Sequence, residues 1–193
     1  QATDVKRWRK AERLRLLHER QKLVPKVRQS LTWQLQENLT GFLRSLGTVC
    51  VSGYWPIRSE PDLRAALKDV IARGGRAGLP VVAERNQPLI FRAWSPGDRL
   101  ERGIWDIPTP PAEAETVRPD VLLAPFLGFD SDCYRLGHGG GYFDRTLAAL
   151  DYQPVVIGVG FSMARIPTIY PQPHDIPMSV IITESGILRP TQG

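Results

Sequence analysis

Four glycines stand within five positions in the last third of the chain, at Gly137, Gly139, Gly140 and Gly141. A helix is predicted to begin directly after them, at about Tyr142. Glycine lets backbone N–H groups turn toward a ligand, because no Cβ blocks a positive φ or a close approach. The start of a helix adds unsatisfied N–H groups and the positive end of its dipole. The spacing is therefore typical of a cradle for phosphate oxygens.

Charged residues flank this glycine loop. Arg135 at its entrance offers a forked cationic contact, and Asp144 in the first helical turn offers a ligand for a metal ion that bridges phosphates. Two simpler interpretations remain open: a tight turn for the glycines, and a carboxylate that stabilises a helix N-terminus for Asp144. The loop lacks the Lys-Ser/Thr ending of a P-loop and the spacing of a dinucleotide fingerprint.

The N-terminal residues are strongly basic. Residues 4–21 are rich in Arg, Lys, Glu and Leu, which predicts a helix. Arg9, Lys10 and Arg13 lie at spacings of three and four, so Arg13 shares one helical face with either neighbour. Such a run either binds an anion or forms a solvated face. The net charge of +5 suits phosphates, polyglutamates and nucleic acid alike.

The elements that position these residues follow from apolar patterning. Apolar side chains recur every three or four residues in a second predicted helix, at Val24, Val27, Leu31, Leu35, Leu39, Phe42 and Leu46. Strands are then predicted at 48–54, 77–83, 89–94, 120–126, 154–161 and 178–183, with helices at 63–72 and 142–150. A proline-rich connection, 96–119, is expected to be irregular and to act as functional cover.

This alternation predicts an α/β fold with three α/β/α layers around a mostly parallel or mixed, Rossmann-like sheet. We expect a single domain over residues 1–193, with a helical N-terminal segment, 1–46, packed on it. The composition agrees, because 42 % hydrophobic and 23 % charged residues are close to the globular average.

Composition also excludes several classes of protein. Two cysteines, Cys50 and Cys133, are too few for a disulfide framework or a Cys-based zinc site, which favours a reducing, cytoplasmic location. No apolar run approaches the roughly 18–20 residues that span a bilayer. Aromatic residues make up 8 % and no nucleic-acid reader motif is present, so we expect neither membrane nor nucleic-acid partners.

Residues 135–144 read Arg-Leu-Gly-His-Gly-Gly-Gly-Tyr-Phe-Asp, which resembles the R-L-G-x-G-x-G-Y-Y-D signature of 5-formyltetrahydrofolate cyclo-ligases. Further similarities to this family follow in the same order along the chain, at 60–62, 103–108, 124–130 and 171–177. The resemblance thus covers almost the whole chain, and the ordered series is more specific than any one motif.

The resemblance implies conversion of 5-formyltetrahydrofolate to 5,10-methenyltetrahydrofolate, with ATP as co-substrate and Mg²⁺ as cofactor. In this family the γ-phosphoryl group moves to the formyl oxygen, N10 attacks the activated carbon, and phosphate leaves. Such an enzyme works mainly by positioning its substrates and offsetting charge. The implied partners are reduced folate and ATP, and we expect a monomer or weak homodimer.

The resemblance also implies site residues. The ATP-binding set is Arg9, Lys10, Arg13, Arg135, Leu136, Gly137, His138, Gly139, Gly140, Gly141, Tyr142 and Phe143. The folate-binding set is Trp55, Glu60, Trp105, His138 and Tyr142. Arg13, Arg135 and Tyr142 are the expected catalytic residues, with Asp144 and Asp175 as metal ligands. The alternatives are core packing for the two tryptophans, a structural role for His138 and a turn at Asp175.

The sequence departs from the family pattern at several positions. Cys133 stands where the family usually has Gly, Leu63 replaces a Thr, and Arg9 falls at the position of a Lys. Phe143 replaces the second signature aromatic, and Ser162 stands where the family commonly has an acidic residue or Gln. An alternative function is therefore a divergent protein that binds ATP or a folate-like ligand without turnover.

Overall fold

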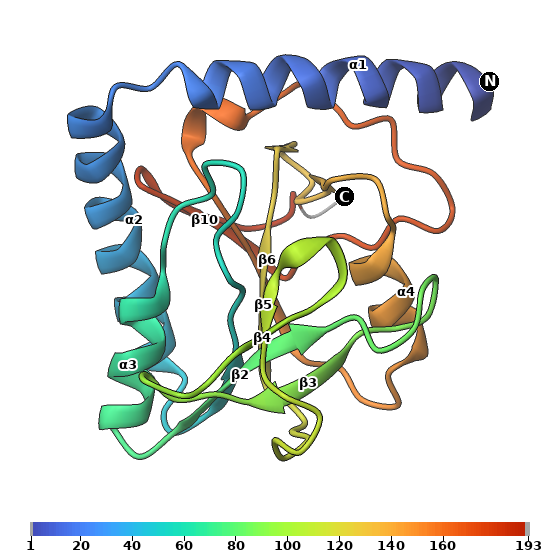
Figure 1. Ribbon diagram of the computed structural model, residues 1–193. Coiled ribbons are helices and arrows are strands. Elements are labelled where there is room, and N and C mark those ends of the chain that lie inside the picture. Colours follow the sequence, from blue (N-terminus) through green and yellow to red (C-terminus); the bar gives the residue numbers. More distant parts are fainter. Residues whose placement is uncertain (1, 192–193) are drawn as a thin grey trace.

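Residues 2–191 are described by a computed structural model, in which they form a seven-stranded central sheet (Figure 1). The strand order is β11-β10-β9-β6-β1-β2-β3. The strands are β1 (Cys50–Ser52), β2 (Arg76–Val81), β3 (Ile90–Ala93), β6 (Val121–Pro125), β9 (Val155–Val159), β10 (Val180–Thr183) and β11 (Gly186–Leu188). The five inner strands are parallel, whereas the edge strands β3 and β11 pair antiparallel. The predicted mixed α/β fold is confirmed.

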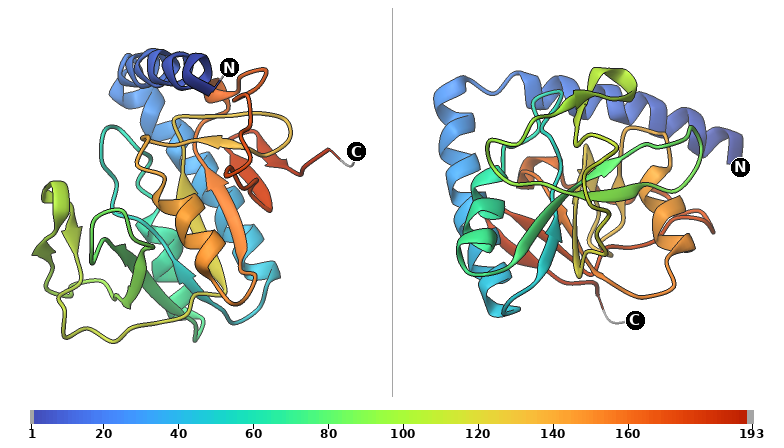
Figure 2. Two further views of the ribbon diagram at one scale, coloured as in Figure 1. Left: turned by 90° about the vertical axis from the view of Figure 1, so that its right-hand side faces the viewer. Right: turned by 60° about the horizontal axis from the view of Figure 1, so that its bottom comes forward.

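Both faces of the sheet are covered by helices. α2 (Pro25–Ser45) and α3 (Arg64–Ala72) pack on one face, and α4 (Tyr142–Ala149) lies on the other (Figures 1 and 2). Along β6, Val121 and Leu123 belong to the core under α2 and α3, while Leu122 and Ala124 belong to the core under α4. Burial on both faces explains why such strands read as continuous apolar runs rather than alternating ones.

α1 (Ala2–Gln21) crosses the edge at which the parallel strands end, along the top of Figure 1. Leu16 buries itself in a small cluster with Leu127, Leu136 and Ile169. Arg20 adds hydrogen bonds to carbonyl oxygens that follow β6 and β1. In open α/β sheets this edge is where ligands bind, so α1 is placed to take part in a site.

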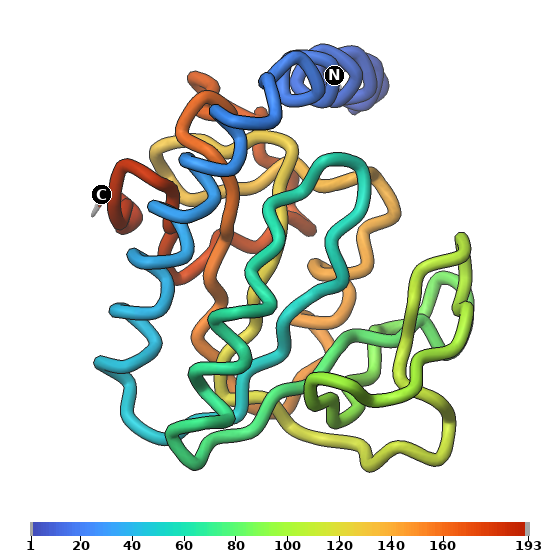
Figure 3. Tube along the Cα trace, turned by 60° about the vertical axis from the view of Figure 1, so that its left-hand side comes forward, coloured from blue at the N-terminus to red at the C-terminus, as the bar shows by residue number. Residues whose placement is uncertain are grey.

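The predicted stripe on α2 is partly wrong. Leu35 and Leu39 are buried as expected, and Leu43, which the stripe omitted, is buried with them. Val24 and Val27 are instead exposed, at 57 % and 46 %. They lie at the corner between α1 and α2, at the end of α2 that Figure 3 shows just below α1.

The connection 96–119 is not wholly irregular. It contains a small antiparallel hairpin of β4 (Glu101–Arg102) and β5 (Pro108–Thr109), with the 3-10 turn η1 (Ile104–Asp106) at its tip. The hairpin stands away from the main sheet (Figures 2 and 3). A second short pair, β7 (Gly128–Phe129) and β8 (Arg135–Leu136), leads into the glycine loop, and the 3-10 turn η2 (Ser162–Ala164) follows β9. In the part of the chain described, no helix has the length and apolar character needed to cross a membrane.

Candidate active site

A cavity of about 720 Å³ opens at the edge of the sheet that α1 crosses. Its walls come from α1, the segment after β1, the β4–β5 hairpin, the glycine loop and the loop before β10. The predicted site residues that line it are Arg9, Arg13, Trp55, Glu60, Trp105, residues 135–144 and Asp175. Segments more than 160 residues apart in the chain therefore meet at one cavity.

The glycine loop presents backbone donors to this cavity. Gly139 and Gly141 adopt left-handed φ values of +101° and +69°, which favour glycine. Gly141 directly precedes α4, whose first amides are unsatisfied by the helix itself. Within residues 2–191, the amides of Gly139, Gly140 and Gly141 donate no hydrogen bond. These free donors at a helix N-terminus are suited to bind an anion.

Arg135 lies beneath the glycine loop. Its Nη1 donates to the carbonyl oxygen of Pro125 at 2.8 Å, whereas its buried Nε has no partner among the described residues. The guanidinium carbon lies 4.7 Å from the centre of the Phe143 ring. Burial lowers the pKa of Arg135, although the carboxylates of Asp144 and Glu60 oppose this shift. A buried donor without an acceptor among the described residues is free to bind a ligand atom or a water molecule.

Two of the predicted N-terminal cations differ in position. Arg13 lines the cavity, and its Nε donates to the carbonyl oxygen of Gly137 at 2.7 Å. Burial lowers the pKa of Arg13, and the neighbouring charge of Arg9 lowers it further. Lys10 is exposed and is not among the residues that line the cavity. The structure thus brings Arg13, but not Lys10, to the glycine loop.

Arg9 is committed to a neighbouring loop. Its Nε donates to the carbonyl oxygen of Ile169 at 3.0 Å, and its Nη1 donates to Asp175 Oδ1 at 3.2 Å. Asp175 Oδ2 also accepts from the backbone N–H of Gln172 at 2.6 Å. Burial raises the pKa of the Asp175 carboxyl, but the hydrogen bonds from Arg9 and Gln172 outweigh it, so that pKa lies below its usual value. Arg9, only 8 % exposed, does not belong to a solvated face.

The two predicted metal ligands fit a cation unequally. Asp144 Oδ1 accepts from the backbone N–H of Ile176 at 3.0 Å, and its other oxygen accepts no hydrogen bond within the described ranges. Both oxygens of Asp175 are already engaged. Residues 2–191 contain no cluster of three or more His, Cys, Asp or Glu side chains that could hold a metal ion. Asp144 therefore suits a hard cation whose other ligands are phosphates and water.

A second part of the cavity holds a buried carboxylate and aromatic rings. Glu60 is 8 % exposed, and its Oε1 accepts from the backbone N–H of Ile57 at 2.9 Å. Trp105 is 59 % exposed at the hairpin tip and meets Tyr142 edge to face, with ring centres 5.7 Å apart. Trp55 is half-buried under the guanidinium of Arg64. Core packing is thus excluded for Trp105, and its face is available to a flat ligand.

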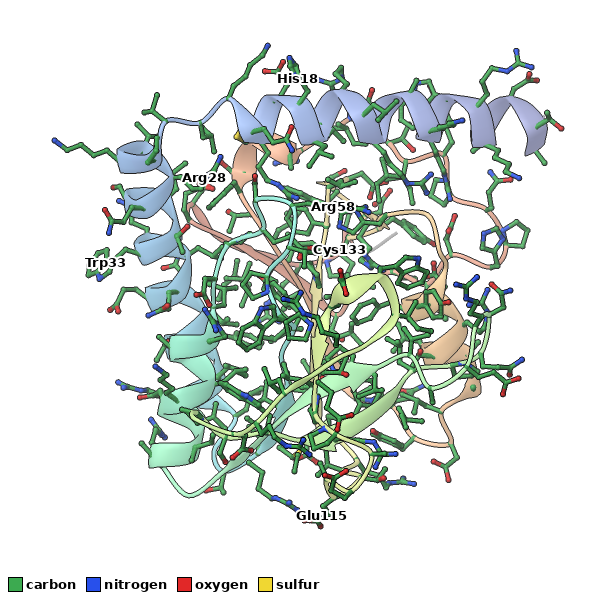
Figure 4. The ribbon with its side chains drawn as sticks, viewed as in Figure 1. His18, Arg28, Trp33, Arg58, Glu115 and Cys133 are labelled. Carbon is green, nitrogen blue, oxygen red and sulfur yellow. The ribbon has the colours of Figure 1, made fainter. Side chains whose placement is uncertain are left out.

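Arg58 is a residue of the cavity that was not predicted from the sequence. This residue follows β1 and lines the cavity below α1 (Figure 4), with its Nη1 3.2 Å from Nδ1 of His138. Its backbone is left-handed, with a φ of +49°. No local periodicity or motif marks it, because its contacts depend on a loop 80 residues later in the chain.

The 5-formyltetrahydrofolate cyclo-ligase family matches this chain over residues 5–184. A 5-formyltetrahydrofolate cyclo-ligase of Mycolicibacterium smegmatis is 34 % identical over 180 residues, which cover 89 % of this chain and 91 % of that protein. The Escherichia coli cyclo-ligase is 25 % identical over 87 % of this chain and 96 % of its own.

Solved structures are similar as well. The solution structure of Aquifex aeolicus 5,10-methenyltetrahydrofolate synthetase has a TM-score of 0.81 and 28 % identity, and it covers 96 % of this chain and 94 % of that one. The Mycoplasma pneumoniae 5,10-methenyltetrahydrofolate synthetase has a TM-score of 0.75 and 25 % identity, over 91 % of this chain and 98 % of that one.

Proposed function

Because the chain belongs to the 5-formyltetrahydrofolate cyclo-ligase family, we propose that it converts 5-formyltetrahydrofolate to 5,10-methenyltetrahydrofolate with ATP as co-substrate. One observation carries this proposal: unbonded glycine amides and the partnerless Nε of Arg135 share a cavity with a buried carboxylate and an exposed tryptophan. The first pair of features suits a triphosphate, and the second suits a reduced pterin.

The triphosphate of ATP binds at the glycine loop. The amides of Gly139 to Gly141 point donors at its oxygens, and the N-terminus of α4 adds a positive dipole. Arg135 and Arg13 supply full positive charges, since a guanidinium stays protonated even when burial lowers its pKa. These groups hold the γ-phosphoryl group and offset the charge that spreads over it during transfer.

Asp144 is the residue that would hold Mg²⁺, through the carboxylate oxygen that is free of other hydrogen bonds. The ion would supply positive charge that offsets the negative charge of the phosphates. For Asp175 the contacts favour a structural role, because its oxygens bind Arg9 and so fix the loop that borders the phosphate region.

The folate binds beside the triphosphate. The Glu60 carboxylate accepts hydrogen bonds from the N–H groups of the pterin, and Trp105 packs against its flat ring. Tyr142 joins the two regions, because it begins α4 after the glycine loop and its ring contacts Trp105. With both substrates bound in this way, the formyl group would lie next to the γ-phosphorus, and holding the two in line would lower the barrier to phosphoryl transfer.

The chemistry then balances without covalent help from the protein. The formyl oxygen takes the γ-phosphoryl group and ADP leaves. N10 of the folate attacks the activated carbon and loses its proton, the C–O bond breaks, and phosphate departs with the oxygen. The residues around the cavity bind, orient and offset charge, which is what such a reaction requires.

A direct assay tests the proposal. Purified protein incubated with 5-formyltetrahydrofolate, ATP and Mg²⁺ should produce the absorbance of the methenyl product, with one ADP formed per product. The Asp144→Asn variant should lower turnover at least about tenfold, since it removes one charge-assisted ligand. Thermal stabilisation by ATP and the folate without any product would instead support the binding-only alternative, which the comparisons do not favour.

We also place the enzyme in the cytoplasm. Both cysteines are free thiols in the structure, which fits a reducing compartment where ATP and reduced folates are available.

A further inference from the structure

His138 joins two loops that bind different substrates in the proposed function. Its imidazole extends from the glycine loop to the segment between β1 and α3. Nε2 lies 3.3 Å from Oε2 of Glu60, and Nδ1 lies 3.2 Å from Nη1 of Arg58. These partners are 78 and 80 residues away in the chain.

The partners define one protonation state of the ring. A guanidinium can only donate hydrogen bonds, so Nδ1 must accept from Arg58. Nε2 then carries the proton and donates a hydrogen bond to the carboxylate of Glu60. Both contacts are therefore satisfied by a neutral imidazole in a single tautomer, which is assigned here from its partners.

Two further hydrogen bonds involve the backbone of this segment. The carbonyl oxygen of Arg58 accepts from Nη2 of Arg20 at 2.6 Å, which ties the segment to α1. Glu60 Oε1 is held by the N–H of Ile57, and only 3 % of the Glu60 side chain is exposed. Oε2, the oxygen that remains for a ligand, is directed by His138 alone among the described residues.

We propose that His138 is a positioning residue for folate binding. This proposal rests on the proposed function, because Glu60 is the carboxylate expected to bind the pterin. The imidazole aims Oε2 of Glu60 and joins the folate segment to the phosphate loop. Its side chain is 29 % exposed, so that its removal leaves no large void in the core.

A pair of variants tests this role. His138→Ala removes both contacts, whereas His138→Gln keeps an amide donor for Glu60 and an oxygen that can accept from Arg58. We expect His138→Ala to raise KM for 5-formyltetrahydrofolate about tenfold, as loss of a hydrogen bond to a charged group does. KM for ATP and kcat should change less than about twofold, and the thermal midpoint should shift by less than about 4 °C. His138→Gln should restore KM for the folate to within about threefold of wild type. Unchanged KM for the folate, or equal rises for both substrates, would overturn the proposal.

A double-mutant cycle tests whether Arg58 acts through His138 or binds the substrate directly. If Arg58 acts by holding the His138 ring, Arg58→Ala and the double variant lose folate affinity about as much as His138→Ala alone. Losses that multiply would mean that Arg58 binds the substrate itself, which contradicts the proposed chain of contacts.

Calorimetric binding of 5-formyltetrahydrofolate keeps this test independent of turnover. If the wild-type protein binds the folate but forms no product, the proposed reaction is wrong, whereas the positioning role of His138 can still be tested by binding. Affinity that falls in His138→Ala and returns in His138→Gln still supports the positioning role.

Discussion

Arg13 and Lys10 are neighbours on α1, yet the structure gives them opposite environments. Arg13 uses only Nε for a hydrogen bond within the described residues, so its two terminal nitrogens remain available at the cavity. Lys10 is exposed and outside the cavity. The sequence spacing allowed either Arg9 or Lys10 to join Arg13 at the phosphates, because spacing alone does not fix how a helix is rotated about its axis against its neighbours.

We therefore predict that Arg13→Ala raises KM for ATP at least tenfold and KM for the folate less than about threefold, because a charge-assisted contact to phosphate is lost. The matched variant Lys10→Ala should change both values less than twofold. Steady-state kinetics with each substrate varied in turn measure this. Equal losses for ATP and folate in Arg13→Ala would mean that α1 has a structural role only.

Cys133 shows how a departure from the family pattern is accommodated. It stands where the family usually has glycine, and its φ of +64° is the left-handed conformation that glycine adopts without strain. Its side chain is fully buried in the core under α4. Burial raises the pKa of the Cys133 thiol to about 11. The substitution therefore alters a turn beside the site rather than adding a reactive group.

The thiol should accordingly be inert in the native protein. At pH 8 a thiol with this pKa is ionised in only about one molecule in a thousand, and the thiolate is the reactive form. We predict that iodoacetamide labels Cys133 far more slowly than a free cysteine, and that both cysteines react quickly once the chain is unfolded in denaturant. Peptide mass spectrometry over a time course distinguishes the two sites, and rapid native labelling of Cys133 would refute its burial.

At the scale of the elements, length decides what the sequence could predict. The helices and parallel strands carry several apolar residues at regular positions, so these elements could be predicted from the sequence. The hairpin β4–β5 and the pair β7–β8 consist of two-residue strands, which have no periodicity. The contact of Arg9 with Asp175 joins residues 166 positions apart and has no local signal at all.

The contact between Arg9 and Asp175 ties α1 to the loop before β10. The ion pair is largely buried, with 10 % and 7 % of the two side chains exposed. Because the pKa of Asp175 is lowered by folding, its contribution to the free energy of unfolding is present above the unfolded pKa, near 4, and is lost as the pH falls through the lower folded value.

We predict that Asp175→Asn lowers the free energy of unfolding by about 2 kcal/mol at pH 7, as loss of a hydrogen-bonded charge does. The difference from wild type should stay constant down to about pH 5 and shrink below pH 4. Glu115→Gln, which breaks an exposed pair with Arg76, should change stability by less than about 0.5 kcal/mol and serves as the control. Urea unfolding at several pH values measures both. A difference that stays the same down to pH 2 would exclude the ion pair as its cause.

At the scale of the whole molecule, the site exists because five parallel strands end at one edge. The segments after β1 and before α4 reach the cavity from that edge, and α1 and the β4–β5 hairpin close it from two sides (Figures 1 and 2). The sequence predicted the layers but not the strand order, since order depends on pairing between distant strands. The cavity depends on this strand order, so it could not be predicted from the glycine motif alone.

Two substrates that share one cavity should protect different walls of it from hydrogen exchange. A non-hydrolysable ATP analogue alone is expected to slow exchange in residues 9–13 and 137–144, because the phosphate donors belong to those segments. Addition of 5-formyltetrahydrofolate should extend the protection to residues 55–60 and 104–109, while α2 on the far side of the sheet stays unchanged. Exchange measured by mass spectrometry in three states, free, with nucleotide and with both ligands, resolves these segments. Protection of the hairpin by the nucleotide alone would mean that the hairpin does not belong to the folate region. A lack of protection in α1 would mean that α1 does not contact the nucleotide, and either result would contradict this division of the cavity.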